Sequence, residues 1–154
     1  MNIRPIKIAD KAKLVTLLDD ISLFTSDERA VALELLEDTS PSSDYHFLGT
    51  FENDGALSSF ICFGPTPMTH GTYDMYWVGT GDQFQRRGLA RTLVNEMKNV
   101  LLKKKARMIR IETSGKDNYV STRAFYENIQ LTEEARLRDF YSVGDDLIVY
   151  MFRF

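Results

Sequence analysis

The sequence predicts an α/β (α+β) fold in which about seven strands and four helices form one domain over residues 1–154. Three observations lead to this prediction. Short stretches rich in β-branched and aromatic residues alternate with longer stretches whose apolar residues recur at helical spacing. Single strands between helices occur together with runs of consecutive strands, which is typical of a mixed architecture. A chain of 154 residues is also long enough to bury a complete core without disulfide or metal cross-links.

The N-terminal region is expected to contain an edge strand followed by two helices. Residues Asn2–Ile8 form the strand, and Pro5 within it favours an edge because proline cannot donate to a ladder. Asp10 stands where it can cap a first helix that carries a leucine-rich apolar face. Thr25 and Glu28 have the spacing of a capping box, so a second helix is expected to follow Thr25.

The middle of the chain is expected to supply three strands in succession. Residues 39–43 (TSPSS) form a loop, and the Asn53-Asp54-Gly55 sequence is a hairpin signal between the first two strands. A further loop, Pro65–Gly71, leads into the third strand. The expected strands are Tyr45–Phe51, Leu57–Phe63 and Tyr73–Thr80.

The C-terminal half is expected to alternate helices and strands and then to end in a hairpin. Apolar residues from Leu89 to Leu101 recur at helical spacing and predict the longest helix. The later elements are a strand at Met108–Glu112, a helix at Ser121–Asn128, and strands at Leu131–Tyr141 and Leu147–Phe154. The resulting order is β-α-α-β-β-β-α-β-α-β-β.

Composition narrows the classes of function. The net charge is −3, which argues against extensive contact with nucleic acid. No apolar run approaches the roughly 20 residues that span a bilayer, and the N-terminus lacks the layout of a signal peptide. The single cysteine, Cys62, lies in an apolar strand and is expected to be buried and inert, which fits a reducing cytoplasm. No cluster has metal-ligand spacing, so we expect no metal.

The segment that joins the third of these strands to the longest helix predicts a phosphate-binding site. It contains Gln85-Arg86-Arg87-Gly88-Leu89-Ala90-Arg91. A helix N-terminus presents unpaired N–H groups and the positive end of the helix dipole, and both stabilise bound phosphate. Gly88 and Ala90 lack bulky side chains, which lets a phosphate approach the backbone, and three arginines (Arg86, Arg87 and Arg91) surround the position.

The Gln-x-x-Gly-x-Ala pattern between a strand and a helix resembles the pyrophosphate-binding motif of the GNAT superfamily of acetyl-CoA-dependent N-acetyltransferases. The order of strands and helices along the whole chain is also similar to the order in that family. The resemblance implies a mixed central sheet with helices on both faces and with two central strands that splay apart. It further implies that acetyl-CoA is the co-substrate and that its pyrophosphate binds to Gln85–Arg91.

The resemblance also assigns residues that hold the thioester. Val78, Gly79 and Thr80 match the positions whose backbone amides bind the acetyl carbonyl and the pantetheine arm, and the Val78 N–H would polarise the carbonyl. Gly79 has an alternative interpretation as a β-bulge. Asn118 is the nearest residue to the asparagine that usually contacts the coenzyme, because Tyr119 occupies the matching position. After the helix, Gln130-Leu131 replaces the usual Gly-Phe.

Two further residues are candidates for proton transfer. Asp74 matches a carboxylate that serves as general base in some family members, and strict strand alternation would place it on the same face as Tyr76 and Val78. A water that Asp74 orients is an alternative base, as are His46 and His70; so is a purely structural role for Asp74. Tyr126 matches the tyrosine that protonates the coenzyme A thiolate, although beside Phe125 it is also a candidate core residue.

The sequence therefore predicts an N-acetyltransferase that moves an acetyl group directly from acetyl-CoA to a primary amine in a ternary complex. A small or amino-acid-like amine is the preferred acceptor, and a protein N-terminus or lysine is the second choice. A non-catalytic acyl-CoA-binding module is the alternative from another class. A homodimer through the C-terminal strands is left open.

Overall fold

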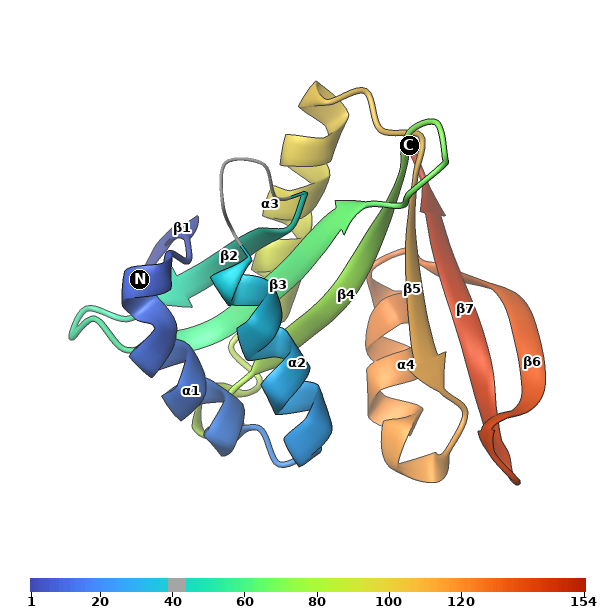
Figure 1. The fold of residues 1–154 in the computed structure, drawn as a ribbon, viewed down its shortest axis with the longest axis horizontal. Coiled ribbons are helices and arrows are strands. Elements are labelled where there is room, and N and C mark those ends of the chain that lie inside the picture. Colours follow the sequence, from blue (N-terminus) through green and yellow to red (C-terminus); the bar gives the residue numbers. More distant parts are fainter. Residues whose placement is uncertain (39–43) are drawn as a thin grey trace.

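The computed structural model describes residues 1–38 and 44–154, and the loop expected at 39–43 lies outside the described residues. Within this part of the chain the expected seven strands and four α-helices are confirmed (Figure 1). The strands are β1 (Asn2–Pro5), β2 (His46–Phe51), β3 (Leu57–Pro65), β4 (Thr72–Thr80), β5 (Met108–Ser114), β6 (Thr132–Ser142) and β7 (Asp145–Arg153). The helices are α1 (Lys11–Asp20), α2 (Ser26–Glu37), α3 (Leu89–Lys103) and α4 (Val120–Asn128).

All seven strands belong to one mixed sheet in the order β1-β2-β3-β4-β5-β7-β6. Every neighbouring pair is antiparallel except β4 and β5, which are parallel and are joined by α3 as a crossover. Proline-containing β1 forms one edge, as its sequence predicts. The chain thus changes from a meander to a crossover at the centre of the sheet, which is where the phosphate-binding motif lies.

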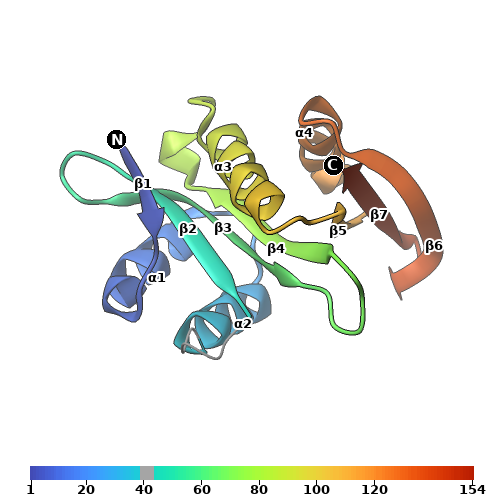
Figure 2. The ribbon, with the colours of Figure 1, turned by 90° about the horizontal axis from the view of Figure 1, so that it is seen from above.

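Helices cover both faces of the sheet, with α1 and α2 on one side and α3 and α4 on the other (Figure 2). Each face has its own apolar core. The core under α1 and α2 includes Leu14, Leu36 and Phe60, whereas the core under α3 and α4 includes Leu93 and Met97. Cys62 is fully buried in the first of these cores, and burial raises the pKa of its thiol, which makes it unreactive as expected.

The parallel pair at the centre of the sheet opens into a seam. β4 and β5 pair only at Thr72–Asp74 with Met108–Arg110, although β4 continues to Thr80 and β5 to Ser114. Figure 1 shows the two strands together at one end and diverging toward the other. Because unpaired strand backbone carries free N–H and C=O groups, the seam offers main-chain hydrogen bonds to a ligand.

Several element boundaries differ from the prediction for local reasons. Asp10 does precede α1, but its carboxylate does not cap the helix; it binds Arg4 at 2.7 and 2.8 Å and the Lys7 N–H at 3.1 Å. These contacts turn the chain after Pro5, so β1 ends before Ile8. The capping box at Thr25 and Glu28 is confirmed, with reciprocal hydrogen bonds of 3.2 and 2.8 Å.

The exit from α4 keeps the backbone shape that glycine usually provides. Gln130 adopts a φ of 71°, in the left-handed region. It therefore takes the backbone conformation of the glycine that is usual at this position in the family that the sequence resembles. Leu131 then enters the core, where it is 3% exposed. Among the described residues, none of the helices has the length and apolar character needed to cross a membrane.

Candidate active site

The segment between β4 and α3 forms a loop whose backbone is shaped to bind an anion. Arg86 and Gly88 have φ values of 62° and 75°, both in the left-handed region, and Gly88 is the N-cap of α3. The first hydrogen bond of the helix runs from the Thr92 N–H to the Gly88 carbonyl at 3.0 Å. The N–H groups of Leu89, Ala90 and Arg91 therefore lack partners inside the helix and remain available to a phosphate.

Gly88 leaves open space at the centre of this loop. A Cβ atom built on Gly88 would meet no heavy atom within 4 Å. Leu89 is 3% exposed and anchors the start of the helix in the protein interior. The loop therefore leaves open space beside N–H groups that have no partner within the helix, an arrangement that favours an anion.

The three arginines of the loop differ in their surroundings. Arg87 binds Glu52 at 2.9 Å and lies 5.8 Å from the centroid of the Phe84 ring, so part of its charge is already compensated by the protein. In the described part of the chain, Arg86 and Arg91 form no ion pair. We therefore expect Arg86 and Arg91 to supply most of the cationic charge to a bound pyrophosphate.

One cavity of about 610 Å³ brings together every residue that the sequence predicts for the coenzyme. It runs from the phosphate-binding loop along β4 to α4. Its lining includes Val78, Gly79, Thr80, Gln85, Arg86, Arg87, Gly88, Leu89, Ala90, Arg91, Asn118 and Tyr126. A Cβ atom on Gly79 would lie 2.8 Å from Ile21 and 2.9 Å from Phe60, so glycine is required there by close packing. The register irregularity of this strand lies elsewhere, at Tyr76.

Tyr126 lies at the far end of this cavity from the phosphate-binding loop. The residue is 5% exposed, and its ring packs against those of Phe125 and Tyr150. Burial raises the pKa of its phenol, so the hydroxyl stays protonated throughout the neutral range. Tyr126 is therefore a core residue and a cavity residue at the same time, and its hydroxyl is suited to donate a hydrogen bond.

A second cavity of about 470 Å³ adjoins the first. Val78, Asn118, Thr122 and Tyr126 line both cavities, so the two meet at the seam between β4 and β5. The walls of the second cavity come from the α1–α2 connection, α2, β4, β5, the β5–α4 connection, α4 and the β6–β7 hairpin. The sequence does not indicate this cavity, because its residues are distant in the chain and share no motif.

The expected position of Asp74 is wrong in one respect. In β4, Trp77 pairs with Cys62 and Met75 pairs with Phe63, so Tyr76 is an extra, bulged residue. The bulge interrupts the alternation, and Met75 and Val78 consequently pack into the same core. Asp74 therefore faces the side of the sheet opposite to the Val78 side chain, where strict alternation had placed both on one face.

Asp74 is held by an ion pair at the closed end of the seam. It is 8% exposed, and its carboxylate accepts a hydrogen bond of 2.7 Å from the Arg110 Nε, which raises the pKa of Arg110. Asp74 lines neither cavity. The same holds for both histidines: His46 stacks on Phe63, and the His70 carbonyl binds Arg107.

An opened parallel strand pair with a glycine-containing phosphate loop defines an acyltransferase of the coenzyme A-dependent class. The family model of the acetyltransferase (GNAT) family matches residues 13–130. The structure is similar to the crystal structure of a GNAT-family protein from Desulfovibrio desulfuricans, with 34% identity, coverage of 99% of this chain and 98% of that chain, and a TM-score of 0.94. The chain therefore belongs to the GNAT family of acetyltransferases.

More distant structures share the fold. The ribosomal-protein-S18-alanine N-acetyltransferase of Escherichia coli is 17% identical, with coverage of 99% and 92% and a TM-score of 0.78. An aminoglycoside N-acetyltransferase complexed with coenzyme A is 14% identical, with coverage of 99% and 97% and a TM-score of 0.77. No curated protein matches the sequence significantly. The Escherichia coli enzyme is named for a ribosomal protein and the other enzyme for aminoglycosides, so the shared fold alone does not determine the acceptor.

Proposed function

We propose that the protein transfers the acetyl group of acetyl-CoA to the primary amine of a small molecule, directly and within a ternary complex. The observation that carries this proposal is the junction of two cavities at Val78 and Tyr126. The first cavity is lined by the phosphate-binding loop, and we assign it to the coenzyme. The second approaches the same point from another side and has the volume of a small-molecule site.

The reaction is a substitution at the thioester carbonyl. The amine nitrogen forms a bond to the carbonyl carbon, the carbon–sulfur bond breaks, the amine loses a proton and the thiolate gains one. Binding both partners in adjoining cavities converts this encounter into a step within one complex, which lowers its entropic cost. The unpaired backbone of β4 at Val78 would donate a hydrogen bond to the carbonyl oxygen, where negative charge develops.

Loss of the amine proton is the second requirement. An alkylamine with a pKa of about 10.4 is neutral only about once in 2,500 molecules at neutral pH, so removal of its proton favours reaction. Asp74 is ion-paired and lines neither cavity. We therefore assign it the indirect form of the base role, in which a water between the amine and the Asp74–Arg110 pair accepts the proton.

Initial rates should show a sequential pattern when acetyl-CoA and an accepted amine are both varied. We expect intersecting lines in a thiol-release assay, with the N-acetylated amine as the product identified by mass spectrometry. Cys62→Ala is the control, and it should retain transfer because the fully buried thiol carries no acyl group. Parallel lines, together with an acetylated protein, would contradict direct transfer.

Asp74→Asn should lower kcat/KM by about 10- to 50-fold, less than the roughly 100-fold typical of a direct base, because bulk water can still accept the proton. Steady-state kinetics with an accepted amine measures this effect. Arg110→Gln is the matched control, since it removes the same ion pair but keeps the carboxylate. If both variants lose activity equally, Asp74 has a structural role and the assignment is wrong.

A further inference from the structure

The second cavity contains more acidic charge than its own cations compensate. Glu28 comes from α2, Glu112 from β5 and Asp145 from the start of β7, and all three line the cavity together with a single cation, Lys116. None of the three carboxylates lines the first cavity. They are therefore set back from the junction at Val78 where transfer takes place.

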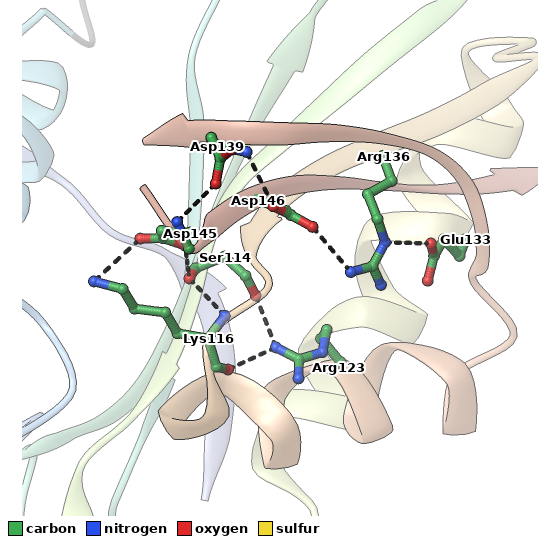
Figure 3. A network of polar contacts seen from close by, with 9 residues as sticks. Ser114, Lys116, Arg123, Glu133, Arg136, Asp139, Asp145 and Asp146 are labelled. Carbon is green, nitrogen blue, oxygen red and sulfur yellow. Dashed lines mark hydrogen bonds and ion pairs between the residues drawn. The ribbon is translucent and has the colours of Figure 1, made fainter. Parts of the chain in front are cut away.

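The contacts of these carboxylates show where the uncompensated charge lies. Asp145 accepts a hydrogen bond from the Ser114 hydroxyl and lies 3.5 Å from Lys116, so its charge is paired (Figure 3). Glu112 lies 3.5 Å from Arg110, but that guanidinium is already bound to Asp74 at 2.7 Å. Arg110 thus serves two carboxylates and can neutralise only one of them.

Glu28 has no cationic partner in the described part of the chain. Its carboxylate accepts the Thr25 N–H at 2.8 Å, a bond that orients the side chain without cancelling its charge. The charged residues that line the cavity are Glu28, Glu112, Asp145 and Lys116. Counted together with the Asp74–Arg110 ion pair, they carry a net charge of about −2 at neutral pH. A ligand with the opposite charge would complement it.

Aromatic side chains make up much of the cavity wall. Tyr76, Trp77, Tyr119 and Tyr141 all line it. Burial raises the pKa of the Tyr141 phenol, and the carboxylates of Glu112, Asp145 and Glu28 raise it further, which places all three within electrostatic reach of one ring. Figure 3 shows how Arg123 binds the carbonyls of Ser114 and Lys116, each at 2.8 Å, and so fixes the end of β5 beside Asp145.

We propose that the acceptor is a diamine-class compound, in which an alkyl chain carries the reacting primary amine at one end and, at the other, a second amine nitrogen that is protonated at neutral pH. This inference rests on the proposed function. The reacting amine lies at the junction near Val78, and the second nitrogen lies among Glu28, Glu112 and the aromatic wall. The methylene chain between them packs against the rings, and the cation gains from their faces as well as from the carboxylates.

The chemistry of the nucleophile favours two nitrogens over one. A reacting amine must be neutral, yet a carboxylate beside it stabilises the ammonium form and raises its pKa. Each unit of such an increase removes about nine-tenths of the reactive neutral amine. A monoamine attracted by the acidic residues would therefore lose reactivity. A second nitrogen that stays charged uses the same attraction without this loss.

Three acceptors of equal chain length test the inference. Putrescine, butylamine and γ-aminobutyrate all carry a primary amine at one end of a four-carbon chain. The other end is a second primary amine in putrescine, a methyl group in butylamine and a carboxylate in γ-aminobutyrate. We expect kcat/KM to fall in that order, with putrescine preferred over butylamine by roughly tenfold, as two partly exposed ion pairs and a cation–π contact would give. Equal use of butylamine, or preference for γ-aminobutyrate, would overturn the inference.

The double substitution Glu28→Gln and Glu112→Gln identifies the groups responsible. Glutamine keeps the capping box at Thr25, so α2 should remain intact. We expect the putrescine-to-butylamine ratio to fall to within about twofold of one, since only weak contacts remain. Glu133→Gln, an exposed change on β6, should leave the ratio as it is. A ratio that survives the double substitution would overturn the assignment.

The same assay separates the two proposals. If acetyl-CoA binds in calorimetry but no amine releases thiol, the proposed transferase function fails and the diamine inference fails with it. If butylamine or γ-aminobutyrate is acetylated without preference for putrescine, the transferase function stands and only the diamine inference is refuted.

Discussion

Gly88→Glu should weaken acetyl-CoA binding by at least about 100-fold, which corresponds to about 2.7 kcal/mol. The new side chain would fill a hollow that is empty within 4 Å of the Cβ position. It would also place a carboxylate among the free N–H groups of α3, where the pyrophosphate must bind, and like charges in such contact cost several kcal/mol. Calorimetric titration with acetyl-CoA measures the loss.

A matched control separates this effect from backbone strain. Gly144, between β6 and β7, has a φ of 80°, close to the 75° of Gly88, and its Cβ position is likewise free within 4 Å. Gly144→Glu therefore imposes the same left-handed strain and the same charge, about 1 kcal/mol of backbone cost, outside the coenzyme cavity. Its affinity for acetyl-CoA should equal that of the wild type. Equal affinities for all three proteins would show that the pyrophosphate binds elsewhere.

The coenzyme side of the site could be predicted because its information is local. The phosphate-binding loop is contiguous in sequence, and the geometry of a strand, a glycine turn and a helix N-terminus follows from neighbouring residues. Helical and strand periods likewise located every element to within a few residues. Side-chain contacts between distant residues were not predictable, such as the ion pair that draws Arg87 toward Glu52.

The error at Asp74 has a non-local cause. Alternation along β4 is correct until Tyr76, where the extra residue results from pairing with Cys62 and Phe63 on β3. Nothing in the sequence around Tyr76 indicates that bulge. The second cavity has the same character, because Glu28, Glu112 and Asp145 lie on α2, β5 and β7, which are distant in the sequence and meet only in the folded chain. Sequence patterns reveal sites that one segment builds, and they miss sites that topology assembles.

Tyr126→Phe should lower kcat by about 100-fold while leaving the affinity for acetyl-CoA within about threefold, which is the effect expected for loss of one hydrogen-bond donor to developing negative charge. The phenylalanine ring preserves the packing against Phe125 and Tyr150, so folding should be little affected. Because burial raises the pKa of Tyr126 above its usual value, the phenol is a weaker acid than a thiol. It therefore stabilises the departing thiolate mainly by donating a hydrogen bond.

Tyr150→Phe provides the comparison that assigns the effect to a hydroxyl in the cavity. The Tyr150 ring lies 5.6 Å from that of Tyr126, and its hydroxyl donates to Glu127 at 3.4 Å instead of lining either cavity. Its removal should leave kcat unchanged, and the wild-type kcat should show no decline from Tyr126 ionisation up to about pH 10. Retention of kcat in Tyr126→Phe would show that the Tyr126 hydroxyl takes no part in the transfer. Equal losses in both variants would show that the effect comes from packing and not from a hydroxyl in the cavity.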